Sequence, residues 1–108
     1  MLYLRLKKNT DFQKLFKRGK KVFSPYVTVL YYPSRATKMG IALSKKHGKA
    51  VVRNRIKRLI RAAFASCAGD LASHYDLVII PKACDDYSYK NFEKSLQSCI
   101  RKINSCQS

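Results

Sequence analysis

The segment KKHGKAVVRNRIKRLIRAAF, residues 45 to 64, holds the residues whose types and spacing most clearly indicate a chemistry. Eight of its twenty side chains are Lys or Arg, and none is acidic. A lysine ammonium binds phosphate as a point charge, whereas the planar guanidinium of arginine can hold two phosphate oxygens and stack on a base. The segment therefore predicts a polyanion-binding surface, with a phosphodiester backbone as the expected ligand. Its cations are Lys45, Lys46, Lys49, Arg53, Arg55, Lys57, Arg58 and Arg61.

The charge of the whole chain also favours an anionic partner. Its 108 residues carry a formal net charge of +17, and no acidic residue occurs between Asp11 and Asp70. Such self-repulsion opposes compactness, and an anion would relieve it. A hydrophobic fraction of 46% is nevertheless typical of a folded chain rather than a disordered basic tail. We therefore expect a single domain over residues 1–108, with its anion-facing surface in the first two thirds of the chain.

Residues that could hydrolyse a phosphodiester bond unaided are scarce. Acid-base hydrolysis needs a histidine or carboxylate pair at the phosphate, and metal-assisted hydrolysis needs clustered carboxylates. The adjacent Asp85 and Asp86 are more typical of a helix start. We interpret His47 and His74 as surface or capping side chains without a role. The sequence thus predicts neither a catalytic residue nor a metal site in the protein, which argues against an autonomous nuclease.

The cysteines and the lack of long apolar segments indicate the compartment. The four cysteines form no Cys-x-x-Cys pair and have no histidine nearby at metal-ligand spacing, so we expect reduced, mostly buried thiols. No apolar run is long enough for a signal peptide or a membrane span. We therefore expect a cytoplasmic protein without a membrane partner. The cysteines are Cys67, Cys84, Cys99 and Cys106.

Apolar periodicity and turn residues predict about four strands and three helices. A first helix is expected over residues 10–18, between a Thr10 cap and Gly19, and a last helix over 89–103. Strands are expected at 26–32, 39–45 and 75–82, with a short one at 22–24. The basic segment forms the middle helix, which ends at Gly69.

The middle helix is amphipathic when about 100° is allowed for each residue. Its apolar sector holds Val52, Ile56, Leu59, Ile60 and Ala63. Its basic sector holds Asn54, Lys57, Arg58 and Arg61, with Arg53 and Arg55 on the flanks. A solvated helix face usually mixes both signs of charge, and this one does not. Composition alone still fits a solvated face that makes only weak polyanion contacts.

The order of the elements favours RNA over DNA. Strands flank the basic helix, so a helix-turn-helix DNA reader is not expected, and zinc-finger spacing is absent. Aromatic residues near cations suit unpaired nucleotides, because bases stack on aromatic faces. These aromatics are Phe12, Phe16, Tyr26, Tyr31 and Tyr32. For Phe12 and Phe16, this argument alone favours core packing over RNA contact.

Three blocks of the chain together resemble the protein subunit of bacterial ribonuclease P. They are LKKNTDFQKLFKRGK (residues 6–20), GIALSKKHGKAVVRNRIKRLIRAAF (40–64) and YDLVIIPK (75–82). The central block is the specific one, because it has the family's Arg-Asn-Arg helix signature after a Ser-Lys-Lys strand end. The resemblance covers nearly the whole chain.

The resemblance implies a fold and a function. The implied fold is a two-layer α/β (α+β) sandwich similar to a domain of a ribosomal protein, with a left-handed β-α-β crossover around the basic helix. The implied function is that of a small protein cofactor in a ribonucleoprotein that removes the 5′ leader of precursor tRNA, with hydrolysis by the catalytic RNA and its Mg²⁺. The implied partners are that RNA and precursor tRNA, without DNA or an obligatory protein partner. A structural RNA-binding protein, such as a ribosomal protein, is the alternative.

The resemblance also implies roles for individual residues. Contacts with the catalytic RNA are expected from Lys45, Lys46, Lys49, Arg53, Asn54, Arg55, Lys57, Arg58 and Arg61. A cleft for the single-stranded leader is expected from Phe12, Phe16, Lys17, Arg18 and Tyr31. Alignment of the strand leaves open whether Tyr31 or Leu30 faces this cleft. The resemblance thus reverses the core interpretation of the two phenylalanines.

Overall fold

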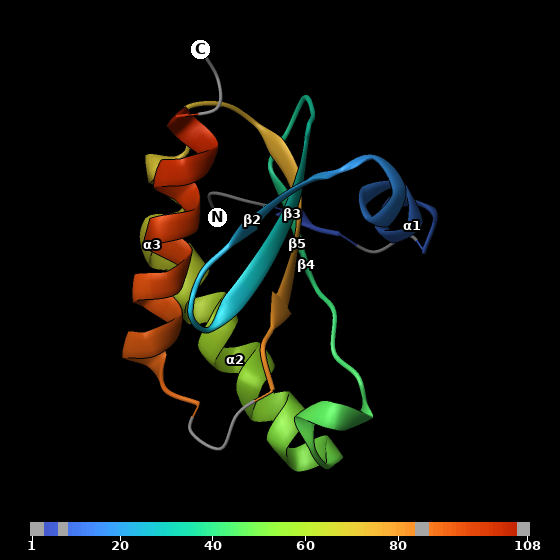
Figure 1. Cartoon of the computed structure of the whole chain (residues 1–108), viewed down its shortest axis with the longest axis vertical. Coiled ribbons are helices and arrows are strands. Elements are labelled where there is room, and N and C mark those ends of the chain that lie inside the picture. The colour runs from blue at the N-terminus through green and yellow to red at the C-terminus, as the bar shows by residue number, and fades with distance from the viewer. Residues whose placement is uncertain (1–3, 7–8, 84–86, 106–108) are drawn as a thin grey trace.

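The computed structural model describes residues 4–6, 9–83 and 87–105, which form a five-stranded sheet with three α-helices. Helices α2 and α3 cover one face of the sheet, and α1 lies on the other (Figure 1). The α/β class is confirmed, with five strands where about four were expected. The elements are β1 (Leu4–Arg5), α1 (Asn9–Arg18), β2 (Lys20–Phe23), β3 (Val27–Pro33), β4 (Lys38–Ile41), the 3₁₀ turn η1 (Lys45–His47), α2 (Ala50–Cys67), the 3₁₀ turn η2 (Ala68–Asp70), β5 (Tyr75–Pro81) and α3 (Tyr89–Ser105).

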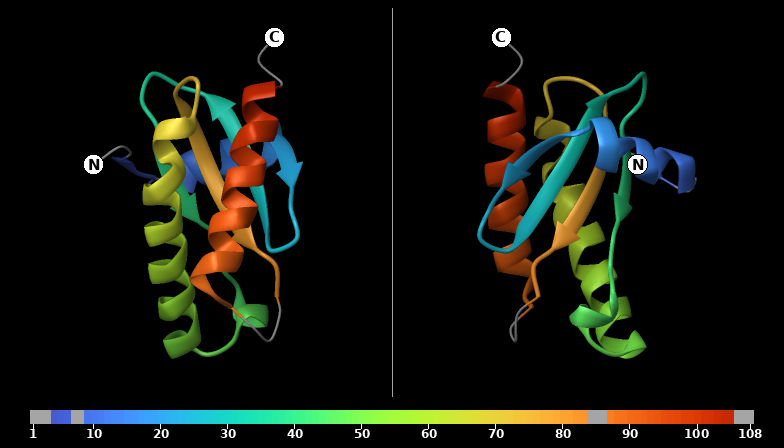
Figure 2. Two further views of the ribbon diagram at one scale, coloured as in Figure 1. Left: turned by 90° about the vertical axis from the view of Figure 1, so that its left-hand side faces the viewer. Right: turned by 45° about the vertical axis from the view of Figure 1, so that its right-hand side comes forward.

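The connection from β4 through α2 to β5 has an unusual hand. The sheet order is β1-β4-β5-β3-β2, so β4 and β5 are neighbours, and they are parallel. In the left view of Figure 2, α2 lies in front of the sheet, both strands run down the page, and β4 is left of β5. This crossover is left-handed, as the resemblance implied, although nearly all such connections are right-handed. Because the strands are parallel, both end at the edge of the sheet where η1 and α2 begin.

Each face of the sheet has its own apolar cluster. Leu77 and Ile79 of β5 point into the larger cluster beneath α2 and α3, whereas Val78 points to the smaller cluster beneath α1. Strand β5 is therefore buried on both faces, which explains its nearly continuous apolar sequence. The last helix packs as its periodicity predicted, with Phe92, Leu96, Cys99, Ile100 and Ile103 all buried.

Three departures from the predicted elements have local causes. Strand β1 has two residues, too few to produce a periodic pattern. Strand β4 ends at Ile41 rather than at residue 45, because the chain leaves the sheet and turns into η1. Val52, expected in the buried sector, is 38% exposed and its neighbour Val51 is 80% exposed. The first turn of α2 extends past the end of the sheet, so these side chains have no strand to cover them (Figure 1).

The two cysteines in the described part of the chain are core residues. Cys67 of α2 and Cys99 of α3 are buried free thiols, as expected, whereas Cys84 and Cys106 lie outside the described residues. Burial raises the pKa of Cys67 to about 11, and Asp70 adds a smaller effect in the same direction. The Cys67 thiol therefore stays protonated at neutral pH and is not a nucleophile.

Candidate RNA interface

The exposed side of α2 forms one continuous basic surface. Arg55 and Arg58 are exposed with Asn54, while Arg53, Lys57 and Arg61 are partly exposed. The first turn of α2 contains no acidic residue, and its N-cap, Lys49, makes no side-chain capping bond. The positive end of the helix dipole thus adds to the charge of the side chains. We call this surface, with Lys46 and Lys49 before it, the basic helix surface; Lys45 lies in η1 and the position of its side chain is not described.

A second surface lies between α1 and the sheet. Phe16 is 49% exposed on α1, whereas Phe12 is partly buried and packs against the smaller apolar cluster. Lys17 and Arg18 are exposed in the last turn of α1, where cations complement the helix dipole. The structure therefore brings four of the five predicted leader-cleft residues to one side of the sheet.

Tyr31 is the fifth, and its placement in the leader cleft is wrong. It is 4% exposed and packs edge-on against Tyr75 in the core beneath α2 and α3, with ring centroids 5.4 Å apart. Side chains alternate between the two faces of a strand, so the next residue, Tyr32, lies on the α1 side. There the Nζ of Lys14 sits 4.5 Å from the centroid of the Tyr32 ring. The alternative, Leu30, is on the α1 side but is 1% exposed.

Phe12 closes over a glycine that has no room for a larger residue. A Cβ atom added to Gly40 of β4 would lie 2.5 Å from the Cζ of the Phe12 ring and 3.2 Å from the Cβ of Leu6. Sequence patterns did not identify Gly40 as part of this surface. Its role follows from the close approach of α1 to β4.

We expect Gly40→Ala to push the Phe12 ring out of place, because the added methyl group overlaps it. The free energy of unfolding should fall by about 1–3 kcal/mol, as for other overpacked sites. Urea denaturation measures this change. The double variant Phe12→Leu with Gly40→Ala should lose less than the sum of the two single changes. Additive losses would show that the ring and the methyl group do not compete for the same space.

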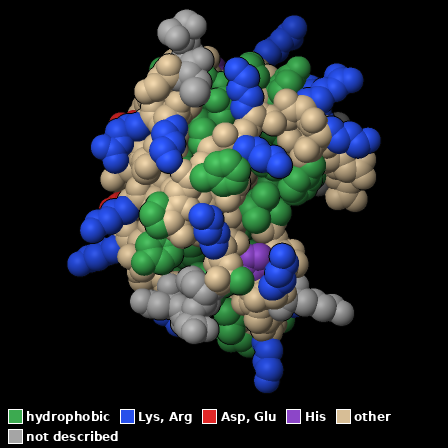
Figure 3. All heavy atoms as spheres, in the orientation of Figure 1, with side chains coloured by type: hydrophobic (Ala, Val, Ile, Leu, Met, Phe, Trp, Pro, Cys, Tyr) green, Lys and Arg blue, Asp and Glu red, His purple; other side chains and the backbone are tan. Residues whose placement is uncertain are grey.

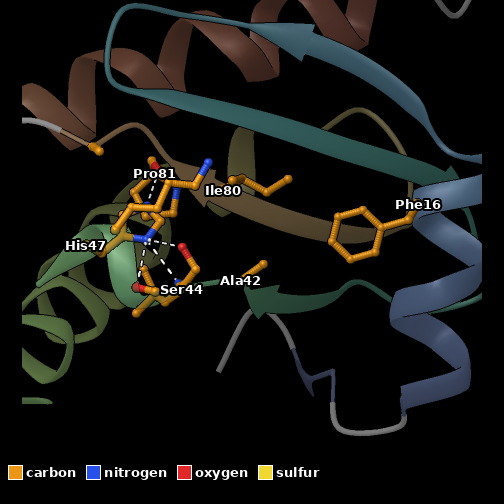
Figure 4. Close-up of a pocket in the computed structure, with 9 residues that line it drawn as sticks. Phe16, Ala42, Ser44, His47, Ile80 and Pro81 are labelled. Carbon is orange, nitrogen blue, oxygen red and sulfur yellow. Dashed lines mark hydrogen bonds between the residues drawn. The ribbon is translucent and has the colours of Figure 1, made fainter.

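A pocket of about 230 Å³ joins the two surfaces. Figure 3 shows the hollow below α1, walled by apolar side chains and bordered by Lys and Arg. The pocket is lined by Phe16 of α1 (Figure 4) and also by Lys46 of η1. A strand of RNA on one surface could therefore continue onto the other. The lining residues are Phe16, Ala42, Leu43, Ser44, Lys46, His47, Ile80, Pro81 and Ala83.

His47 is the pocket residue that sequence reasoning missed. It is 6% exposed, so the surface interpretation is wrong, whereas the capping interpretation agrees with the bond that its ring accepts from the N–H of Ser44, just before η1. Its ring bonds to the backbone of Ser44 and to the carbonyl oxygen of Pro81. The next residue, Gly48, has a φ of 104°, a conformation that favours glycine and redirects the chain into α2. A partner 34 positions away leaves no local signal in the sequence. The other histidine, His74, is exposed, and its Nδ1 lies 3.1 Å from the hydroxyl oxygen of Thr37.

Metal-ligating side chains are scattered in the part of the chain that the structure describes. Within residues 4–6, 9–83 and 87–105, no three His, Cys, Asp or Glu side chains gather where they could hold a metal ion. Asp85 and Asp86 lie outside this part of the chain. No helix in the described residues is long and apolar enough to cross a membrane.

Fold and surfaces together define a basic α/β protein of the RNA-binding class. Residues 3–104 match the family model described as Ribonuclease P. The chain belongs to the ribonuclease P protein family. It is 44% identical over 104 residues to the ribonuclease P protein component of Clostridium kluyveri, covering 91% of this chain and 92% of the relative. It is 45% identical over 105 residues to the ribonuclease P protein component of Bacillus velezensis, and the match covers 93% of this chain and 89% of the relative.

Solved structures of the family share the fold. The RNase P protein of Staphylococcus aureus matches with a TM-score of 0.77 at 33% identity, over 92% of this chain and 93% of that one. The RNase P protein of Thermotoga maritima matches with a TM-score of 0.81 at 28% identity, over 92% and 96%. These likenesses disfavour the alternative of an unrelated structural RNA-binding protein.

Proposed function

We propose that this chain is the protein subunit of a bacterial ribonuclease P ribonucleoprotein, in the cytoplasm, and assists endonucleolytic removal of the 5′ leader from precursor tRNA. The observation that carries the proposal is the pocket at which the aromatic surface of α1 meets the basic segment before α2. Two RNA molecules must be held side by side in such a complex. A protein with two adjoining RNA surfaces meets that requirement.

The basic helix surface binds the catalytic RNA in this proposal. Its cations neutralise phosphates and release condensed counterions, which gives an affinity that falls steeply with salt. Asn54 is exposed among them and can hydrogen bond to phosphate or ribose. No carboxylate on α2 competes for these cations. The contact residues are Lys45, Lys46, Lys49, Arg53, Asn54, Arg55, Lys57, Arg58 and Arg61.

The surface between α1 and the sheet binds the single-stranded leader. The exposed ring of Phe16 offers a face on which a base can stack, and Tyr32 takes the place expected of Tyr31. Lys17 and Arg18 lie at the end of the same helix, where they can contact the leader backbone. Phe12 supports this surface from beneath through its packing on Gly40.

The chemistry belongs to the RNA subunit in this proposal. Mg²⁺ bound by that RNA would supply the activation of water and the stabilisation of charge that phosphodiester hydrolysis needs. Within the residues that the structure describes, no three His, Cys, Asp or Glu side chains gather to hold a metal ion, so this proposal gives the protein a role in binding and positioning. Its cations lower the repulsion between the two RNA molecules, and its aromatic surface fixes the leader beside the cleavage site.

The test is cleavage of a leader-bearing precursor tRNA at low Mg²⁺ concentration with a bacterial ribonuclease P RNA, with and without the protein, and with the protein alone. We expect strong stimulation only when both subunits are present. RNA binding without stimulation would favour a structural ribonucleoprotein role. Cleavage by the protein alone would place the chemistry in the protein and overturn the proposal.

A further inference from the structure

Lys14 is an exposed cation of α1 that the proposed RNA contacts leave without a role. Its Nζ lies 4.5 Å from the centroid of the ring of Tyr32, which is partly exposed on β3. An aromatic ring attracts a cation over its face, and this attraction holds the ammonium in one place. The ring face that Lys14 covers cannot at the same time stack on a base. The pair therefore offers a fixed positive charge, for which phosphate is the natural ligand on an RNA.

The carboxylate beside Tyr32 in the sheet does not pair with this charge. Asp76 of β5 lies opposite Tyr32, and its Oδ1 is buried without a hydrogen-bond partner in the described part of the chain. The ammonium of Lys14 therefore makes no bond with that oxygen. Lys38 of β4 lies on the other side of Asp76 and is partly exposed. The two lysines together outweigh the charge of the carboxylate between them.

Lys14 and Phe16 project from opposite flanks of α1. Leu15 between them is buried against the sheet, and each neighbour in the sequence is turned from it by about 100°. Phe16 lines the pocket, so we call the other flank of α1, with Lys14, the far flank. Lys17 is exposed on the outer surface of the helix, and Arg18 lies on the far flank one turn after Lys14. Cations thus continue from the pocket flank around the helix to the far flank.

The sheet beneath α1 shows how far apart the two flanks lie. Ile80 of β5 lines the pocket, whereas Asp76, opposite Tyr32, lies four residues before it on the same strand. Four residues of a strand span about 13 Å. Val78, midway between them, is buried beneath α1, and the right view of Figure 2 shows that helix crossing the strands. A ligand that reaches both flanks must therefore pass over the outer surface of α1.

We propose that the part of the leader farther from the cleavage site crosses α1 and binds Lys14 through a phosphate, with Tyr32 as the residue that positions the ammonium. The proposal rests on the proposed function, because its ligand is the leader. The pocket is lined by Lys46 and adjoins the basic helix surface. Nucleotides next to the scissile bond must stay close to the catalytic RNA, so they occupy the pocket. More distant nucleotides then pass Lys17 and Arg18 and reach the far flank.

The first experiment measures the affinity of the reconstituted holoenzyme for precursor tRNAs whose leader is shortened one nucleotide at a time, with Ca²⁺ replacing Mg²⁺ to slow cleavage. With a long leader, Lys14→Ala should lower the affinity about five-fold, as for the loss of one hydrogen bond. The slope of log affinity against log salt should become shallower by about 0.7, the contribution of one phosphate in a single strand. With a short leader, Lys14→Ala should have no effect while Phe16→Ala still lowers the affinity.

Three results of this experiment would overturn the proposal. The first is no effect of Lys14→Ala at any leader length. The second is an equal effect at every length, including mature tRNA. The third is an effect of Lys14→Ala with leaders too short to respond to Phe16→Ala. Lys94→Ala is the matched control, because it removes an exposed cation from α3 on the other face of the sheet and should give no loss that depends on leader length.

Variants of Tyr32 test its positioning role. Tyr32→Phe keeps the ring and should bind long leaders as the unsubstituted protein does. Tyr32→Leu keeps an apolar side chain without the ring and should lose affinity for long leaders only. The double variant Lys14→Ala with Tyr32→Leu should lose no more than Lys14→Ala alone, because Tyr32 acts through Lys14. Equal binding by the two Tyr32 variants, or additive losses in the double variant, would overturn the positioning role.

The second experiment identifies the phosphate. Single leader phosphates are replaced by uncharged methylphosphonates, one position at a time, and each RNA is bound to the unsubstituted holoenzyme and to the Lys14→Ala holoenzyme. At the contacted position, the uncharged group should abolish the difference in affinity between the two proteins. A difference that survives at every position would overturn the phosphate contact.

Failure of the proposed function would look different. In that case the unsubstituted holoenzyme would show no preference for leader-bearing over mature tRNA at any leader length. A leader preference that does not depend on Lys14 would leave the proposed function standing and overturn the far-flank site alone.

Discussion

Replacing Arg58 by alanine is expected to weaken binding to the catalytic RNA by about 10- to 100-fold, the effect of one charged hydrogen bond. Arg58 is exposed on α2, and no acidic residue of that helix pairs with it. The slope of log affinity against log salt should become shallower by about one, because one phosphate contact is removed. Filter binding or fluorescence titration over a series of salt concentrations measures both quantities.

Two comparisons give this prediction its specificity. Arg61→Ala should have a smaller effect, because Arg61 is only partly exposed and has an interaction within the protein. Arg101→Ala removes an exposed cation from α3, outside the basic helix surface, and should change the slope less. Equal slopes for Arg58→Ala and Arg101→Ala would mean that only net charge matters, and would remove α2 from the specific interface.

The second large effect is expected for Phe16→Ala in leader recognition. Loss of one stacked base costs about 1–3 kcal/mol, so affinity for leader-bearing tRNA should fall by about five- to 150-fold. Mature tRNA lacks the leader, and its affinity should hardly change. Since the Phe16 ring is half exposed, the variant should remain folded. Equilibrium binding of the two tRNA forms to the holoenzyme measures the difference.

Phe23→Ala is the matched control for this variant. Phe23 is 57% exposed on β2 and does not line the pocket. Its removal takes away a similar amount of exposed aromatic surface, so it should leave leader preference intact. Similar losses for leader-bearing and mature tRNA in Phe16→Ala would indicate a packing role for this ring and argue against stacking.

The sequence is informative wherever a residue's type alone determines its environment. Ile56, Ile60 and Ala63 repeat with the period of a helix, and they are buried as predicted. The exposure of the α2 cations could be predicted without tertiary information. Lys and Arg side chains are rarely buried unless they are paired, and this segment has no acidic residue to pair with them. The Ser-Lys-Lys and Arg-Asn-Arg motifs then placed these elements in a known family.

The remaining features depend on register and on distant contacts. Tyr31 and Tyr32 are adjacent aromatics in a strand covered on both faces, so no polar alternation shows which of them faces α1. The pairing of Tyr31 with Leu77 and of Tyr32 with Asp76 determines which tyrosine faces α1. That pairing joins parts of the chain that are far apart in the sequence. The environment of His47 could not be predicted from the sequence either, because its ring bonds to Pro81, which is distant in the chain.

The antiparallel pairing of β3 with β5 also has a consequence for how the protein folds. Pro33 lies opposite Tyr75, so residues 34–74, which include all of α2, are looped out when the central pair forms. Proteins dominated by such non-local contacts fold slowly, and here the loop carries the densest positive charge in the chain. Salt or an RNA polyanion that screens this charge should speed loop closure. A peptide of residues 45–64 is not expected to replace the protein, because a short helix is marginally stable without the sheet that buries its apolar stripe.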